Sequence, residues 1–127
     1  MDTILIIEDS TDILENLTEF LEMEGYKVLG AKNGKEGVKI AAASVPDLII
    51  CDVLMPVMDG HEVLKFLLNT AKTNRIPFIF STSMSEKIDK AESLRLGADG
   101  YIVKPFELDQ LLRMVKQWIK SGSHRPV

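Results

Sequence analysis

Five short apolar runs, separated by longer segments, constrain the fold of this chain more than any other feature of its sequence. The first, third and fourth runs are almost continuous in Ile, Leu, Val and Phe, which is typical of strands in a sheet covered on both faces. The runs are Thr3 to Ile7, Tyr26 to Leu29, Asp47 to Cys51, Pro77 to Phe80 and Tyr101 to Val103. Because helical segments alternate with them, we expect a doubly wound α/β domain with a five-stranded parallel sheet and five helices.

The segments between the runs have the apolar spacing of helices. The clearest stripe lies near the end of the chain, at Leu108, Leu111, Leu112, Val115, Trp118 and Ile119. Asn33, Asp59 and Ser83 each stand three residues before a glutamate, a pattern typical of the first turn of a helix. The segment from Ser85 to Leu96 has only a broken stripe, so we expect its helix to be the least stable element.

Carboxylates follow two of the predicted strands. Glu8 and Asp9 come after the first strand, and Asp52 comes after the third. In the common strand order 2-1-3-4-5 these strands are neighbours, and ligands bind beyond their carboxyl ends. Two such charges about 4 Å apart repel by roughly 4 kcal/mol at an effective dielectric constant near 20, so the cluster requires a counter-charge. Hard oxygen ligands of this kind favour Mg²⁺.

Hydroxyl and ammonium groups follow the fourth and fifth predicted strands. The fourth ends in Ser81, Thr82 and Ser83, and the fifth ends in Lys104. A metal ion, a hydroxyl and an ammonium around one carboxylate stabilise the oxygens of a phosphoryl group in transfer. We therefore expect Asp52 to act as a nucleophile that forms an acyl phosphate.

With these residues the chain resembles the receiver domains of response regulators, in particular the stand-alone chemotaxis-type receivers. The resemblance implies a flavodoxin-like fold and covers Thr3 to about Lys120, so we expect a receiver domain at residues 1–120 and a flexible tail or truncated linker at 121–127. The motifs that carry it are IIEDS at 6–10, LIICDVLMPVMDG at 48–60, PFIFSTS at 77–83 and GADGYIVKPF at 97–106.

The resemblance implies a role for each acidic residue. Asp52 would be the phosphoacceptor and a ligand of Mg²⁺. Asp9 would bind the ion directly, Glu8 would bind it through water, and the backbone carbonyl of Leu54 would complete the protein ligands.

It also implies a switch. Thr82 and Lys104 would bind oxygens of the phosphoryl group, with a cis peptide bond before Pro105, and Tyr101 would turn inward when Thr82 moves. From the residues alone, an aromatic side chain packed at the edge of the core explains Tyr101 as well as a switch role does. The output surface would comprise the fourth helix, the fifth strand and the fifth helix, at about 85–96 and 101–120.

The partners implied are a histidine kinase or phosphotransfer protein as phosphohistidine donor, and a downstream output protein or domain. The chain would be a signalling switch that assists its own phosphorylation and dephosphorylation, and not an enzyme with a separate substrate. Whether phosphorylation also drives formation of a homodimer is left open by the sequence.

Composition excludes several other classes of protein. The formal net charge of −4 argues against direct binding of nucleic acid, and the single cysteine, Cys51, excludes a disulfide framework. The apolar runs are far shorter than the roughly 20 residues of a membrane span, and no signal peptide is visible. We therefore expect a cytoplasmic domain that does not bind membranes.

Three alternative functions can be weighed against the same residues. A flavodoxin-like electron carrier would require a Gly-rich phosphate loop where Glu8 and Asp9 stand, and an aspartate phosphatase would require a carboxylate where Leu54 stands. The serious alternative is a protein-interaction module of receiver fold that acts without phosphorylation.

Side chains around the expected site suggest further properties. Leu54 and Met84 cannot hydrogen-bond a water molecule that attacks an acyl phosphate, so we expect a long-lived phosphorylated state. Ser83 stands where the family usually has alanine. We expect Cys51 to be an inert buried thiol and His61 to face solvent in the first turn of a helix.

Overall fold

The computed structural model describes residues 1–83 and 94–122. Its strands are β1 (Thr3–Ile7), β2 (Lys27–Ala31), β3 (Leu48–Asp52), β4 (Phe78–Ser83) and β5 (Gly100–Lys104). Its helices within these residues are α1 (Thr11–Met23), α2 (Gly34–Ser44), α3 (Gly60–Leu68) and α5 (Leu108–Ser121). The fifth helix expected from the sequence, at 85–96, lies largely outside the described residues.

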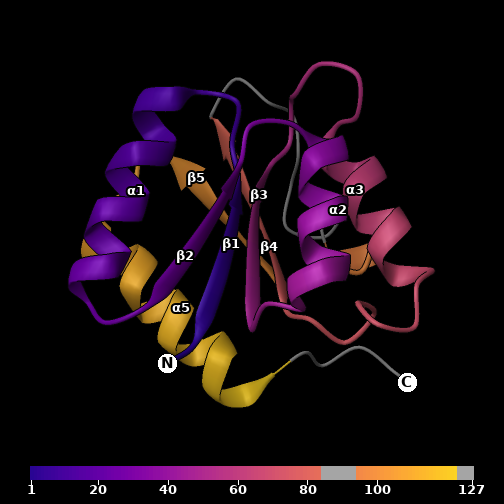
Figure 1. The fold of residues 1–127 in the computed structure, drawn as a ribbon. Helices are drawn as coiled ribbons and strands as arrows, with labels where there is room; N and C mark the ends of the chain where they lie inside the picture. The colour runs from indigo at the N-terminus through magenta and orange to yellow at the C-terminus, as the bar shows by residue number, and fades with distance from the viewer. Residues whose placement is uncertain (84–93, 123–127) are drawn as a thin grey trace.

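The five strands form one parallel sheet in the predicted order β2-β1-β3-β4-β5 (Figure 1). The register places Ile7 beside Cys51, Asp52 beside Ser81, and Ser83 beside Lys104. The carboxyl ends of β1, β3, β4 and β5 therefore lie along one edge of the sheet, where a doubly wound fold binds its ligands.

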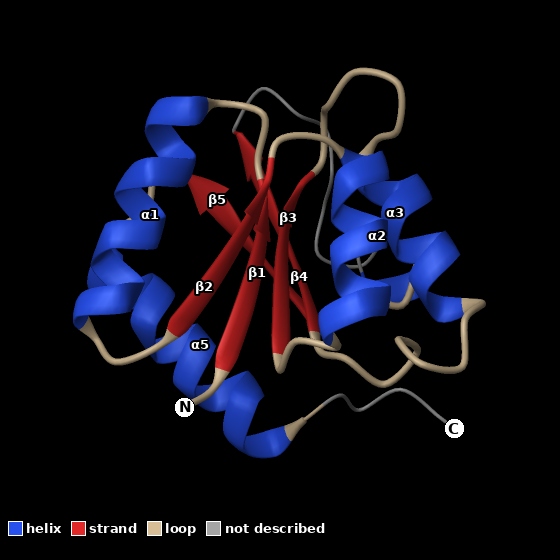
Figure 2. Cartoon of the chain, viewed as in Figure 1, coloured by secondary structure: helices blue, strands red, loops and turns tan. Residues whose placement is uncertain are grey.

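Helices cover both faces of the sheet, as Figure 2 shows. Strand side chains alternate between the faces, so each strand contributes to two cores. Leu5, Ile7, Ile49 and Cys51 pack with side chains of α2 and α3. Ile4, Ile6, Leu48 and Ile50 pack with side chains of α1 and α5. Burial on both faces accounts for the continuous apolar runs in the sequence.

Local signals set the starts of the helices. The side chain of Asn33 accepts a hydrogen bond from Glu36 N, and Asp59 and Glu62 form a reciprocal capping box, both as predicted. The third predicted cap pairs Ser83 with Glu86, and Glu86 lies outside the described residues. The side chain of Ser10 also caps α1, which the sequence reading did not identify.

Strand β4 continues beyond its apolar run, which stops at Phe80, and includes the three hydroxyl residues at which the sequence analysis placed its end. The hydroxyl side chains of Ser81, Thr82 and Ser83 interrupt the apolar pattern, but all three residues pair with β5. Strand β2 likewise begins at Lys27 and ends at Ala31, two residues beyond the predicted end. Among the described residues no helix is both long and apolar enough to span a membrane.

Candidate active site

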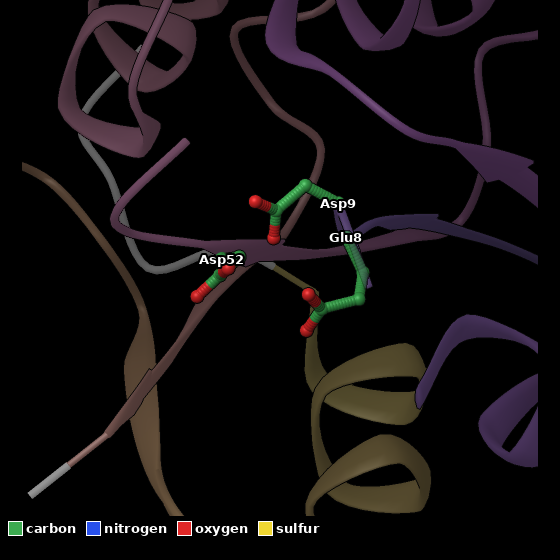
Figure 3. A group of neighbouring side chains, drawn as sticks. All are labelled: Glu8, Asp9 and Asp52. Atoms are coloured by element: carbon green, nitrogen blue, oxygen red, sulfur yellow. The ribbon is translucent and has the colours of Figure 1, made fainter. Parts of the chain in front are cut away.

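Three carboxylates meet at the edge of the sheet where the carboxyl ends of β1 and β3 lie side by side. Glu8 and Asp9 follow β1, and Asp52 is the last residue of β3. One carboxylate oxygen from each lies within 4.8 Å of the others, and Figure 3 shows the three groups facing a shared space. Glu8 and Asp52 are only 2% and 4% exposed, whereas Asp9 is open to solvent. The predicted cluster is therefore present.

Lys104, the last residue of β5, supplies the counter-charge. Its Nζ donates to Glu8 Oε1 at 2.7 Å and to Asp52 Oδ1 at 3.3 Å. Burial alone would lower the pKa of the ammonium, but the hydrogen bond and charge of Glu8, together with the charge of Asp52, raise the net pKa above the usual lysine value. The folded protein therefore keeps Lys104 protonated.

Backbone groups hold the two buried carboxylates in place. Ser10 N donates to Glu8 Oε2 at 3.0 Å, and Val53 N donates to Asp52 Oδ1 at 3.0 Å. Asp52 Oδ1 thus accepts from both Val53 N and Lys104 Nζ. These donors fix the orientation of both carboxylates at the edge of the sheet.

The chemistry of the donor set fits Mg²⁺. Three carboxylates and one ammonium leave a formal charge of −2 at the site, and all the candidate ligands are oxygens. Asp9 is exposed, which leaves room for the several waters that a bound Mg²⁺ retains.

Leu54 and Thr82 lie close to this edge in the fold, whereas Tyr101 is the second residue of β5 and pairs with Phe80. Leu54 follows Asp52 by two residues, and its side chain is 61% exposed. Thr82 is buried near the end of β4, where its register partner is Val103, and its hydroxyl donates to Ser83 O at 3.3 Å. Tyr101 is half-buried and packs on the core beneath α2 and α3. The peptide bond between Lys104 and Pro105 is cis, as the resemblance implied. Met84 lies outside the described residues.

Burial of Cys51 agrees with the expectation from the sequence. His61 lies in the first turn of α3, as expected, but the expectation that it faces solvent was wrong. Burial, followed by the charges of Asp52, Glu8 and Asp59, raises the pKa of the Cys51 thiol well above its usual value. The ring of His61 is half-buried and meets the ring of Phe80 edge to face, with 5.3 Å between centroids. This contact exists because α3 begins close against β3 at Gly60, and it draws the ring away from solvent.

Two polar residues have structural roles that the sequence did not indicate. The carboxylate of Asp99 accepts from Phe78 N at 2.8 Å, and Asp99 N donates to Phe78 O at 2.9 Å, so Asp99 fixes the start of β4 against the segment before β5. Ser81, the register partner of Asp52, carries a buried hydroxyl that has no hydrogen-bond partner within the described part of the chain. No sequence pattern marks either role, since each depends on a neighbouring strand.

Comparison with known proteins gives one consistent result. Residues 4–116 match the family described as the response regulator receiver domain. Protein PilH of Pseudomonas aeruginosa is 36% identical over 115 residues, a match that covers 91% of this chain and 95% of PilH. The chain spans much less of several other relatives, including 9% of a histidine kinase and 45% of a transcriptional regulatory protein.

Solved structures agree with the sequence relatives. The receiver domain of a histidine kinase from Syntrophus aciditrophicus is 37% identical, with a TM-score of 0.87, and the match covers 99% of this chain and 96% of that one. The receiver domain of the sensor histidine kinase PA1611 from Pseudomonas aeruginosa is 28% identical, with a TM-score of 0.86 and coverage of 94% and 98%. That structure holds a magnesium ion in its active-site cleft.

Proposed function

The chain belongs to the response-regulator receiver family, and from that premise we propose that it is a switch controlled by phosphorylation of Asp52. The observation that carries the proposal is the bridge that Lys104 makes between Glu8 and Asp52, beside the exposed Asp9. A carboxylate that could act as a nucleophile, a cation suited to phosphoryl oxygens and oxygen ligands suited to a metal lie together there, which supports the proposal.

The reaction is the transfer of a phosphoryl group from a phosphohistidine to Asp52. A carboxylate oxygen of Asp52 attacks phosphorus while the bond from phosphorus to the histidine nitrogen breaks. That nitrogen keeps the electron pair and takes up a proton, and the product is an acyl phosphate on Asp52. Val53 N and Lys104 Nζ hold the carboxylate in place for the attack.

Mg²⁺ would be held by Asp9 and Asp52 directly, by the backbone carbonyl of Leu54, and by Glu8 through a water molecule. When bound, the ion supplies positive charge that offsets the charge on the transferring oxygens. Lys104 would then bind one phosphoryl oxygen in place of its contact with Asp52, and the hydroxyl of Thr82 would bind another.

The switch follows from the charge that phosphorylation adds. An acyl phosphate brings close to two negative charges and new acceptor oxygens, which would draw Thr82 and Lys104 toward Asp52. Because Thr82 and Lys104 lie near the ends of β4 and β5, their movement would reach Tyr101 and the faces of β5 and α5. The remaining part of the expected output surface, at about 85–96, lies largely outside the described residues.

The proposed partners are a histidine kinase or phosphotransfer protein as donor and a separate protein or attached domain as the recipient of the signal. Relatives of this chain include a histidine kinase and transcriptional regulatory proteins, in which a receiver is one part of a longer protein. A second form of output would be a homodimer of two phosphorylated copies that pair through the surface of β5 and α5. Size-exclusion chromatography with and without phosphorylation would detect it. Since such donors draw on ATP, we place the reaction in the cytoplasm.

The test of this proposal is intact mass spectrometry after incubation with acetyl phosphate and Mg²⁺. Asp52→Asn and a reaction with chelator serve as controls. We expect one added phosphoryl group, absent from both controls. No added mass from acetyl phosphate or from phosphorylated kinases would contradict the proposal and favour an interaction module that acts without phosphorylation.

A further inference from the structure

The loop between β3 and α3 exposes apolar side chains at the mouth of the active site. Leu54 is 61% exposed and Val57 is 93% exposed, while Met55 between them is buried. Figure 1 shows this loop rising above the sheet edge, close to the start of α2. Packing explains Met55, but it does not explain why two large apolar residues of the loop that follows Asp52 are exposed to solvent.

Val57 also has an unfavourable backbone conformation. Its φ is +71°, and Met58 N donates to Pro56 O at 2.8 Å across it, which closes a tight three-residue turn. A β-branched residue in this left-handed region is a conformational outlier, because its Cβ crowds the backbone. Glycine would fit the turn without that cost. A valine here therefore lowers the stability of the free protein and gains no burial in return.

Val45 provides an internal comparison. It is the other non-glycine residue with positive φ in the described chain, at +44°, and its N–H donates to Ala41 O at 2.9 Å as the cap of α2. Its conformation therefore serves the end of a helix, far from the carboxylates. Val57 has no comparable structural role.

The exposed loop borders a hollow that is shared with the active site. Pro56 and Val57 line it on one side, Lys32, Asn33 and Lys35 line it on the other, and Asp9 lies in it. Its volume is about 390 Å³. Both lysines are exposed, and neither forms an ion pair with another residue in the part of the chain that the structure describes.

We propose that this rim, defined as Lys32, Lys35, Leu54, Pro56 and Val57, is a docking surface for the protein that donates the phosphoryl group. The donor would place an apolar side chain on Val57 and Pro56 and an acidic side chain between Lys32 and Lys35. This inference rests on the proposed function of Asp52.

Position and charge both favour a donor as the occupant. The hollow contains Asp9, so a protein seated in it lies against the same crevice in which Asp52 must receive the phosphoryl group. The crevice itself carries a formal charge of −2, and the chain as a whole carries −4. The two lysines offer attraction to an acidic partner, and the apolar side chains offer area to bury.

The test compares a protein donor with a small donor on the same variants. The protein donor is the autophosphorylated histidine kinase that labels the wild-type chain fastest among those of its source organism, and the small donor is acetyl phosphate. The quantity measured is the second-order rate constant for labelling by the kinase divided by that for labelling by acetyl phosphate. We expect Val57→Gly to lower this ratio at least about fivefold while the melting temperature stays level or rises.

Matched control variants show whether a change in the ratio comes from lost docking, from the removal of a positive-φ valine as such, or from a general change in charge. Val45→Gly removes a positive-φ valine away from the site, and its ratio should equal that of the wild-type chain. Lys35→Glu should lower the ratio, most strongly at low salt, whereas Lys39→Glu, one turn further along α2, should not. Equal ratios for Val57→Gly and the wild-type chain would overturn this inference alone. Absence of labelling by both donors would overturn the proposed function and this inference with it.

Discussion

The ammonium of Lys104 joins two carboxylates from different strands, with Nζ 2.7 Å from Glu8 Oε1 and 3.3 Å from Asp52 Oδ1. Glu8 follows β1 and Asp52 ends β3, so the contact connects three strands at the edge that holds the site. The cation that stabilises the buried carboxylates in the free protein is also the one proposed to bind a phosphoryl oxygen. Stability and function are thereby linked through a single side chain.

Replacing Lys104 should destabilise the protein. Lys104→Met leaves Glu8 and Asp52 buried without their cation, and we expect the free energy of unfolding to fall by about 2–4 kcal/mol. Mg²⁺ should stabilise this variant more than the wild-type protein, because the ion would replace the missing charge. Urea unfolding with and without Mg²⁺ measures both effects. Lys39→Met, at an exposed site, is the control; a loss for Lys104→Met no larger than for this control would contradict the prediction.

Alkaline pH should weaken the same contact. The pKa of Lys104 is raised above 10.5 in the folded protein, so the folded state binds its proton more tightly than the unfolded chain. The stabilisation is complete below the ordinary lysine pKa and is lost as pH rises through the raised value. Because the pKa of the Cys51 thiol is raised as well, we would measure unfolding in a Cys51→Ala background, from about pH 9, below the ordinary lysine pKa, to about pH 12. If Lys104→Met in that background showed the same decline, Lys104 would not be its source.

Gly60 should tolerate no side chain. A Cβ at this position would meet the backbone oxygen of Asp52 and lie 3.0 Å from Val53 Cα, so the start of α3 or the end of β3 would have to move. We expect Gly60→Ala to cost about 2–4 kcal/mol and to slow the phosphorylation of Asp52. Gly25→Ala is the comparison, since Gly25 has a φ of +95° but open space around it, and should cost about 1 kcal/mol. Equal losses of stability in thermal or urea unfolding would show that the close approach at Gly60 is unimportant.

Leu54 should control how long the acyl phosphate survives. Its exposed side chain stands two residues after Asp52 and cannot hydrogen-bond a water molecule. We expect Leu54→Asn to accelerate loss of the phosphoryl group about two- to tenfold, the range of one added hydrogen bond, because the amide can orient the attacking water. Decay is followed by intact mass after removal of the donor. Leu54→Ala separates loss of the leucine from gain of the amide, and equal decay for both variants would count against this role.

Much of the fold and most of the site follow from local patterns in the sequence. The apolar runs of β1, β3 and β4 predict strands because the sheet buries almost every residue of these strands on both faces. The strand order then places Glu8 and Asp9 beside Asp52. Lys104 is predictable for the same reason, because it directly follows the fifth run. The location of these residues in the fold follows from their position at or just after the end of a strand, and the apolar pattern of the sequence shows where each strand ends.

Other features depend on contacts that periodicity does not encode. The extension of β4 through Ser83 depends on pairing with β5, and the role of Asp99 depends on Phe78, 21 residues earlier in the chain. His61 faces Phe80 because of how closely α3 approaches the sheet, whereas the sequence places it only in the first turn of a helix. The positive φ of Val57 is contrary to the preference of its residue type, so no sequence rule would have indicated it.

The central claim is that Asp52 carries the phosphoryl group, and borohydride trapping tests it most directly. Sodium borohydride reduces an acyl phosphate and leaves homoserine in place of the aspartate, which peptide mass spectrometry locates by residue. After incubation with acetyl phosphate and Mg²⁺, we predict homoserine at position 52 and none when the ion is chelated. Homoserine at another acidic residue, or unmodified Asp52 in a sample that has gained a phosphoryl group, would contradict the claim.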